Sequence, residues 1–253
     1  MNNLIYALKD DKLTHISRVQ SGLLCGCFCP SCGEELVAKK GNEKMHHFAH
    51  RSGTECQYGY QTSIHIAAKE IIGRSKSFWL PAVYVEFDSH KQKQLVKSAA
   101  PIKIDGAELE KNMGGIIPDI LLTSGGKQLA VEIFVTHAVD AGKLEKFKDR
   151  GISCLEIDLR RKELTDLELR RALLSDSGCK HWRYNAVAEK LKNKFMSACE
   201  KKKVSNGRVK NCPKKGKADL FDDCTLCAFN ISQEEDSIYC SGASGISKIE
   251  DII

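Results

Sequence analysis

The spacing of apolar residues predicts helices in several parts of the chain. Between Gln61 and about Gly73, apolar residues follow an i, i+3, i+4, i+7 pattern, which is typical of one buried helix face. Further helices are predicted over 139–150, 163–174 and 185–203, the last of them rich in lysine.

Apolar and β-branched stretches between these helices predict strands. They are FWLPAVYVEF (78–87), a weaker stretch at 102–105, IIPDILLT (116–123), QLAVEIFVT (128–136) and SCLEIDL (153–159). The order helix, several strands, helix, strand indicates an α/β domain with a sheet flanked by helices.

Composition narrows the class of protein. With 253 residues, 42% hydrophobic and 28% charged, the chain has the composition of a soluble globular protein with one main domain and small modules. No stretch is apolar enough for a membrane span, and the polar start does not predict a signal peptide, so we expect a cytoplasmic protein. Because cytosolic thiols stay reduced, clusters among the twelve cysteines predict metal ligands.

Four segments are predicted along the chain. They are a zinc-binding module (1–57), an α/β domain (58–178), a basic helix and linker (179–211) and a second cysteine-rich module (212–253). Residues 180–217 hold thirteen Lys and Arg against two Glu, whereas 218–253 hold one Lys against eight acids. This asymmetry is compatible with contact to a phosphate backbone, and equally with a solvated basic helix.

The second module holds the cysteines Cys212, Cys224, Cys227 and Cys240. The Cys-x-x-Cys turn and the two outlying cysteines could supply the four thiolates of a tetrahedral zinc ion, in the manner of a zinc ribbon. With few apolar residues nearby, metal binding would supply much of the folding free energy. The alternative is a set of unligated cysteines.

The first module holds a second candidate zinc site. The predicted ligands are Cys29, Cys32, His50 and Cys56, with His47 as the alternative imidazole. Cys25 and Cys27 lie close by in the sequence, so the ligand set is open. A redox role for the Cys-x-x-Cys pair is disfavoured because this pair lies between turns.

Two acidic residues are predicted to meet on one hairpin. With Gly125 and Gly126 as the central turn residues, Ser124 pairs with Lys127 and the same register pairs Asp119 with Glu132. Their Cβ atoms would lie roughly 4.5–5.5 Å apart. Because opposed carboxylates repel, the pair predicts a site for Mg²⁺ or Mn²⁺, although a shifted turn would instead leave one acid in solvent.

The arrangement of these motifs resembles a known family. Pro118-Asp119, followed by Glu132-Ile133-Phe134, is similar to the PD-(D/E)XK nuclease signature. Together with CPSCGEELVAKKGNEKMHHFAH and QTSIHIAAK upstream, the chain resembles the competence protein CoiA-like family over about residues 20–160. The resemblance implies a restriction-endonuclease-like mixed sheet flanked by helices, an N-terminal zinc module, and a role in handling DNA.

The sequence departs from the nuclease signature at two positions. Phe134 stands where the signature has Lys or Gln, and Gln61 stands where an acid often begins the first helix; its carbonyl oxygen can still reach a metal. A substitute cation is therefore expected. Lys69, one turn after His65, is the first candidate, and Lys143 on the following helix is the second.

Other polar residues are predicted near this site. His137, near the end of the Glu132 strand, is a further candidate. His65 is included in the site because of its spacing to Lys69 and its place in the resemblance. Glu156 and Asp158 alternate with apolar residues, so we expect them to face solvent.

Three functions are compatible with these features. The first is a metal-dependent nuclease that hydrolyses phosphodiester bonds in DNA, with zinc in two structural sites. The second is a nuclease-like protein without cleavage activity that binds nucleic acid or a protein partner. The third uses both zinc modules as protein-interaction surfaces. The paired acids Asp119 and Glu132 favour the first, whereas Phe134 and Gln61 favour the second.

Overall fold

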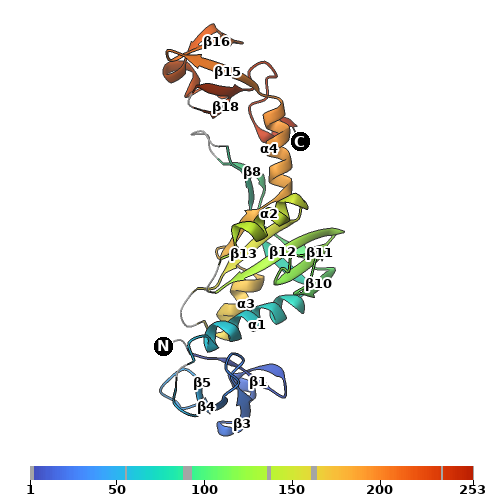
Figure 1. Ribbon diagram of the computed structural model, residues 1–253, viewed down its shortest axis with the longest axis vertical. Coiled ribbons are helices and arrows are strands. Elements are labelled where there is room, and N and C mark those ends of the chain that lie inside the picture. Colours follow the sequence, from blue (N-terminus) through green and yellow to red (C-terminus); the bar gives the residue numbers. More distant parts are fainter. Residues whose placement is uncertain are drawn as a thin grey trace. The chain divides into compact units, whose positions relative to one another are not determined.

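The chain forms two compact units. The computed structural model describes residues 3–54, 56–87, 93–135, 138–160, 164–234 and 236–252. One unit comprises Met1–Pro81 and Ala100–Tyr184, and the other comprises Ala82–Ala99 and Asn185–Ile253. Each unit therefore combines segments that are distant in sequence (Figure 1).

The first unit begins with an antiparallel sheet in the order β2-β1-β3-β4-β5. Its strands are β1 (Tyr6–Lys9), β2 (Lys12–His15), β3 (Gly22–Phe28), β4 (Glu35–Lys39) and β5 (His47–His50). These short strands bring the cysteine-rich segment next to the start of α1 (Gly59–Gly73).

A second sheet lies at the centre of this unit, in the order β10-β11-β12-β13-β14. Its strands are β10 (Gly106–Leu109), β11 (Ile120–Ser124), β12 (Lys127–Phe134), β13 (Ser153–Asp158) and β14 (Lys180–Tyr184). All neighbours are antiparallel except β12 and β13, which are parallel and joined through α2 (Ala141–Asp149). Strand β14 extends the sheet beyond the predicted boundary at residue 178. A short pair, β6 (Ser77–Leu80) and β9 (Ala100–Lys103), completes the unit with α3 (Asp166–Leu174).

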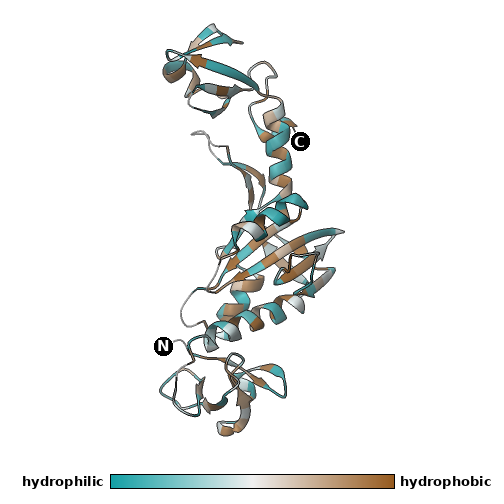
Figure 2. Ribbon diagram, viewed as in Figure 1, coloured by the Kyte–Doolittle hydropathy of each residue, from teal (hydrophilic) through white to brown (hydrophobic). Residues whose placement is uncertain are grey.

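The two faces of the central sheet are covered by different helices. Side chains of Val131 and Ile133 belong to the core that includes α1 and α3, whereas Ala130 contacts the core around Phe147 of α2. Because successive strand residues point to opposite faces, Glu132 projects to the α2 face with Ala130. In Figure 2, where each residue is coloured by its hydropathy, the strands of this sheet carry hydrophobic segments. The unit is thus a mixed α/β structure, as predicted.

The second unit contains most of the C-terminal part of the chain. Its elements are β7 (Val83–Val85), β8 (Gln94–Lys97), α4 (Ala186–Ser197), β15 (Glu200–Ser205), β16 (Arg208–Cys212), β17 (Gly216–Asp219), β18 (Asn230–Gln233) and β19 (Ser237–Cys240). The last five form a sheet in the order β17-β16-β15-β19-β18. None of the helices in the described ranges has the length and apolar composition of a membrane span.

Two predicted elements differ from the structure. FWLPAVYVEF is not one strand: β6 ends at Leu80 and β7 begins at Val83, in separate sheets, because Pro81 lacks the N–H that a continuous ladder needs. The helix predicted over 185–203 ends at Ser197, and β15 follows within the predicted linker. Pairing of β15 with β19 outweighs the local helix propensity of its lysines.

Candidate functional site

A cluster of metal-ligating side chains lies between the N-terminal sheet and α1. The ligand atoms of Cys29, Cys32, His50 and Cys56 all lie within 4.8 Å of one another. Cys32 Sγ lies 3.3 Å from His50 Nε2. In a tetrahedral zinc site with bonds of about 2.3 Å to sulfur, ligand atoms lie roughly 3.5–4 Å apart. The cluster therefore has the chemistry and the dimensions of a Cys₃His metal site.

Local backbone geometry explains this convergence. Gly33 adopts a φ of 74°, and its N–H donates to the Cys29 carbonyl at 2.9 Å, so the chain reverses tightly after β3. Gly59 begins α1, and a Cβ at this position would lie 3.3 Å from Cys29 Sγ and 3.6 Å from Cys56 Sγ. A residue with a side chain would crowd these sulfurs, so glycine permits α1 to start beside the cluster.

The structure also distinguishes among the candidate ligands. His47 is not in the cluster; its Nδ1 lies 2.9 Å from the Met45 carbonyl oxygen. Cys25 and Cys27 are buried and donate to the carbonyl oxygens of Leu36 and Cys25, respectively. The predicted ligand set with His50 is therefore the one that the fold brings together.

The C-terminal cysteines form a looser group. Cys224 and Cys240 belong to one small hydrophobic cluster, and Cys212 packs against it. Burial, followed by the charges of Cys212, Cys227 and Cys240, raises the pKa of Cys224 to about 11. Within the described parts of the chain, however, only the N-terminal cluster brings three or more ligand atoms within 4.8 Å. A second zinc site stays a prediction.

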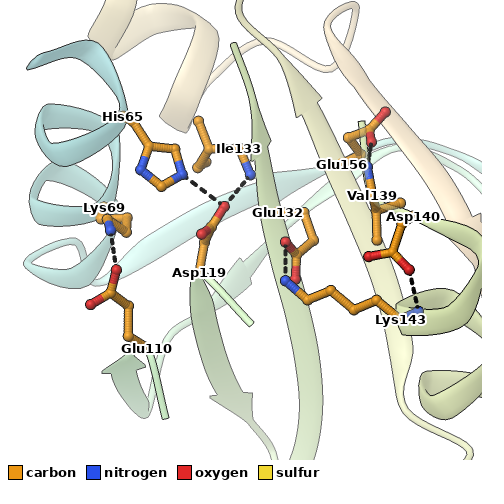
Figure 3. A network of polar contacts seen from close by, with 10 residues as sticks. All are labelled: His65, Lys69, Glu110, Asp119, Glu132, Ile133, Val139, Asp140, Lys143 and Glu156. Carbon is orange, nitrogen blue, oxygen red and sulfur yellow. Dashed lines mark hydrogen bonds and ion pairs between the residues drawn. The ribbon is translucent and has the colours of Figure 1, made fainter. Parts of the chain in front are cut away.

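The predicted hairpin register is present in the central sheet. Ser124 pairs with Lys127, and the pairing continues without a shift to Ile120 and Val131. The next positions are Asp119 and Glu132, which both line a pocket of about 490 Å³. Figure 3 shows the two acids between α1 and α2. The two carboxylates therefore meet in one pocket.

Asp119 is held in its charged form by hydrogen bonds. Its Oδ2 accepts from the Ile133 N–H at 2.8 Å and lies 3.0 Å from His65 Nε2 (Figure 3). Burial by itself raises the pKa of Asp119, but His65, the Ile133 amide and Lys143 together lower it below its usual value. Asp119 is thus a stable carboxylate at neutral pH.

Glu132 has a different environment. Its Oε2 accepts from Lys143 Nζ at 2.7 Å, while its buried Oε1 has no hydrogen-bond partner in the part of the chain that the structure describes. Burial raises the pKa of Glu132 to about 7; the Lys143 hydrogen bond opposes this shift and the charge of Asp119 adds to it. An unpartnered buried carboxylate oxygen next to a second carboxylate matches the chemistry of a divalent cation site, because Mg²⁺ is typically held by one or two carboxylates.

The other candidates separate into two groups. Gln61 and His65 line the acid pocket with Lys143, whereas Lys69 does not. Lys69 Nζ instead donates to Glu110 Oε1 at 2.6 Å (Figure 3). His137 lies outside the described residues. Lys143 is therefore the lysine that reaches the acids.

Phe134 also lines the acid pocket. The guanidinium carbon of Arg160 lies 4.2 Å from the centre of the Phe134 ring, a cation–π contact. A second cation is thus close to the position where the nuclease signature has a lysine.

Glu156 does not face solvent, contrary to the prediction. It is 2% exposed, lies beside Glu132 in the parallel β12–β13 register, and lines the same pocket. Its carboxylate accepts from the Val139 N–H at 2.8 Å and pairs with Arg183 at 3.1 Å. The prediction failed because the alternation of acidic and apolar residues on β13 was taken to mean that the acidic face of the strand contacts solvent, whereas α2 covers that face. One signal could have indicated the burial of Glu156, because strands that pair in parallel are usually covered on both faces. Asp158, by contrast, is partly exposed and pairs with Arg160.

Glu156 also helps to position Lys143. Val139 precedes Asp140, whose side chain caps α2 by accepting from the Lys143 N–H at 2.8 Å. The Glu156–Val139 bond anchors the backbone just before this cap, so a buried carboxylate fixes the start of the helix that carries Lys143 (Figure 3).

Glu132→Gln should change the pH dependence of stability. The pKa of Glu132 is raised from 4.5 to about 7, so protonation of this carboxyl stabilises the folded state of the wild-type protein relative to the unfolded state. The folded state loses this stability as the pH rises through 7. Gln mimics the protonated form, so the metal-free variant should gain stability on the order of 2 kcal/mol over wild type at pH 8.5, and much less at pH 5. Urea unfolding of both proteins at the two pH values measures the difference; a gap independent of pH would contradict the assignment.

The fold and the N-terminal cluster define a mixed α/β protein with several sheets, few helices and a Cys₃His cluster that could hold a metal ion. Residues 10–59 match the family model of the competence protein CoiA N-terminal domain. The match supports the resemblance to the competence protein CoiA family for this N-terminal segment, which holds all the Cys₃His ligands. Comparisons with curated proteins and with solved structures give no match.

Proposed function

We propose that the protein is a metal-dependent nuclease that hydrolyses phosphodiester bonds in DNA. The observation that carries this proposal is the presence of Asp119 and Glu132 in one pocket beside Lys143, with one buried Glu132 oxygen that has no hydrogen-bond partner among the described residues. A sequence under selection for stability alone would tend to avoid two facing acids in an apolar hairpin.

The element order supports a PD-(D/E)XK core. Helix α1 is followed by the antiparallel strands β10, β11 and β12, then by α2 and the parallel strand β13. Such a mixed sheet, with Glu132 on β12 and Asp119 directly before β11, is what the resemblance to this nuclease class implies. The family match at residues 10–59 is consistent with the same proposal.

Five residues of the pocket have roles in this proposal. Asp119 and Glu132 would hold Mg²⁺ or Mn²⁺, which supplies Lewis-acid polarisation of the phosphate and a more acidic bound water. Lys143 compensates negative charge that develops on the phosphate, and so substitutes for the lysine absent at Phe134. His65 orients Asp119, and Gln61 can offer a carbonyl oxygen to the metal.

Zinc is the proposed occupant of the Cys₃His cluster. Three sulfur ligands and one imidazole in a closed arrangement suit a structural zinc ion, which leaves no open position for chemistry. We also propose zinc for the C-terminal cysteines, where thiolates at Cys212, Cys224, Cys227 and Cys240 would need to draw closer around the ion.

One observation favours a second candidate function. Phe134 cannot donate a hydrogen bond, and Lys143 is already paired with Glu132 at 2.7 Å. A nuclease-like protein that binds nucleic acid or a protein partner without cleavage is compatible with both facts. The two functions differ in whether Lys143 contributes to catalysis.

The test is a cleavage assay with matched lysine variants. Purified protein is incubated with single-stranded DNA, duplex DNA and RNA in Mg²⁺, in Mn²⁺, or without added divalent metal. We expect metal-dependent cleavage of DNA. Lys143→Met should lower the rate about 100-fold, because electrostatic stabilisation by a single donor contributes about that factor. Lys69→Met should change the rate by less than about threefold. Binding without cleavage by wild-type protein would instead establish the second function.

A further inference from the structure

The β16–β17 hairpin of the second unit carries a group of lysines, two of which oppose each other directly. Residues 210–217, KNCPKKGK, hold four lysines and no acid. Lys210 on β16 pairs directly with Lys217 on β17, and both are exposed. Like charges at directly opposed positions destabilise a strand pair, so this arrangement costs free energy in the isolated protein.

A second hairpin of the chain shows how such a pair is normally compensated. Lys9 on β1 pairs with Lys12 on β2, again directly opposed. There, the turn between the two lysines consists of Asp10 and Asp11, so two acidic residues lie next to the two lysines in the chain. Within the described residues, neither Lys210 nor Lys217 forms an ion pair with an acid, and Lys215 pairs with Asp223 outside the hairpin. The charge on β16–β17 is thus left for an external anion.

The hairpin also has a recess for that anion. A pocket of about 420 Å³ is lined by Lys210, Asn211, Lys215, Gly216 and Lys217. The pairing of β16 with β17 shifts register between Lys210 and Cys212, and Asn211 adopts a φ of 59°. This irregularity lies at the same end of the hairpin as the recess, which Asn211 lines together with three lysines.

We propose that the β16–β17 hairpin binds phosphate groups of a nucleic-acid backbone. Lysine ammonium groups and an amide donor are typical phosphate ligands, and such contacts position a protein on nucleic acid without reading its sequence. A recess of this size suits one phosphodiester at a time rather than the extended plane of a membrane surface. Lys214 is not assigned to the site, because its Nζ lies 4.5 Å from the centre of the Phe229 ring.

This inference places the nucleic-acid contact within the basic segment 180–217. The opposed lysines of that segment lie on strands that follow α4, and not on the helix itself. The site does not depend on cleavage at Asp119 and Glu132, so either proposal can fail without the other.

The experiment measures binding of the full-length protein to fluorescent 30-nucleotide DNA, single-stranded and duplex, over 50–300 mM salt without added divalent metal. For Lys210→Gln/Lys217→Gln we expect affinity about tenfold lower near 100 mM salt. We also expect the slope of log Kd against log salt to fall by about 2, because roughly 0.9 of a counterion is released per phosphate contact in duplex DNA.

Lys9→Gln/Lys12→Gln is the matched control, since it removes the same charge from an equally opposed pair. It should leave both affinity and slope unchanged. Three results would each overturn the proposal. They are an equal loss of affinity in both variants, no effect of the β16–β17 substitutions, and no binding of DNA by the wild-type protein. Vesicles with phosphatidylserine provide the remaining arm: lysine-dependent binding to vesicles with unaltered DNA binding would assign the hairpin to membranes and overturn it as well.

Discussion

Replacing Asp119 by Asn should lower metal-dependent DNA cleavage by at least about 100-fold. Asn can keep one hydrogen bond to the Ile133 N–H, but it removes the negative charge that attracts a divalent cation. Metal assistance contributes several kcal/mol to transition-state stabilisation, and each 1.4 kcal/mol is about tenfold in rate. Initial rates of DNA cleavage at saturating Mg²⁺ measure the effect.

A matched variant separates this loss from structural damage. Asp105 also accepts a backbone hydrogen bond, from the Gly125 N–H at 2.7 Å, but it lies at the opposite end of the hairpin and outside the acid pocket. Asp105→Asn should therefore cleave DNA within about twofold of wild type. Retention of full activity by Asp119→Asn would eliminate the proposed site, whatever the control does.

The second large effect is expected at the Cys₃His cluster. Cys32→Ser should remove one zinc ion per chain and lower the melting temperature by about 10 °C or more. Cys32 is exposed and packs against little, so the loss would come from the metal and not from the core. Structural zinc contributes folding free energy directly, and a few kcal/mol correspond to about this shift in a chain of this size.

Cys25→Ser provides the control for the cluster. Cys25 is buried on β3 and donates to the Leu36 carbonyl, a bond that a serine hydroxyl can replace. This variant should keep its zinc and lose less stability than Cys32→Ser. Metal analysis and thermal unfolding of both variants decide the matter; equal zinc content in Cys32→Ser and wild type would refute the ligand assignment.

The cluster and the acid pocket are connected through α1. The helix begins at Gly59 against the sulfurs of Cys29 and Cys56, and less than two turns later His65 contacts Asp119. Loss of the metal would release the first turn of this helix. We therefore expect Cys32→Ser to impair the acid site as well, although Cys32 does not line that pocket.

Local sequence patterns predicted several features that the structure contains. Gly125-Gly126 set the turn, and a two-residue turn fixes the register of every later pair, so Asp119 and Glu132 could be matched from the sequence. The apolar spacing from Gln61 to Gly73 predicted α1 to within two residues of its start. In both cases the controlling interactions join residues that are close in the chain.

Other features depended on contacts between distant segments. Lys143 reaches Glu132 because of the position of α2 over the sheet. Lys69 instead donates a hydrogen bond to Glu110, a residue that no pattern in the sequence singled out. The burial of Glu156 likewise followed from α2 covering its face.

By itself, the sequence determined the hairpin register, the helix before the sheet and the residue types able to hold metal, because turn geometry and side-chain periodicity act over a few residues. Only the tertiary structure decided which imidazole joins the cysteines, which lysine reaches the acids and that Glu156 lies in the same pocket. These choices depend on how helices pack across a sheet, and such packing is set by many weak contacts between residues far apart in the chain.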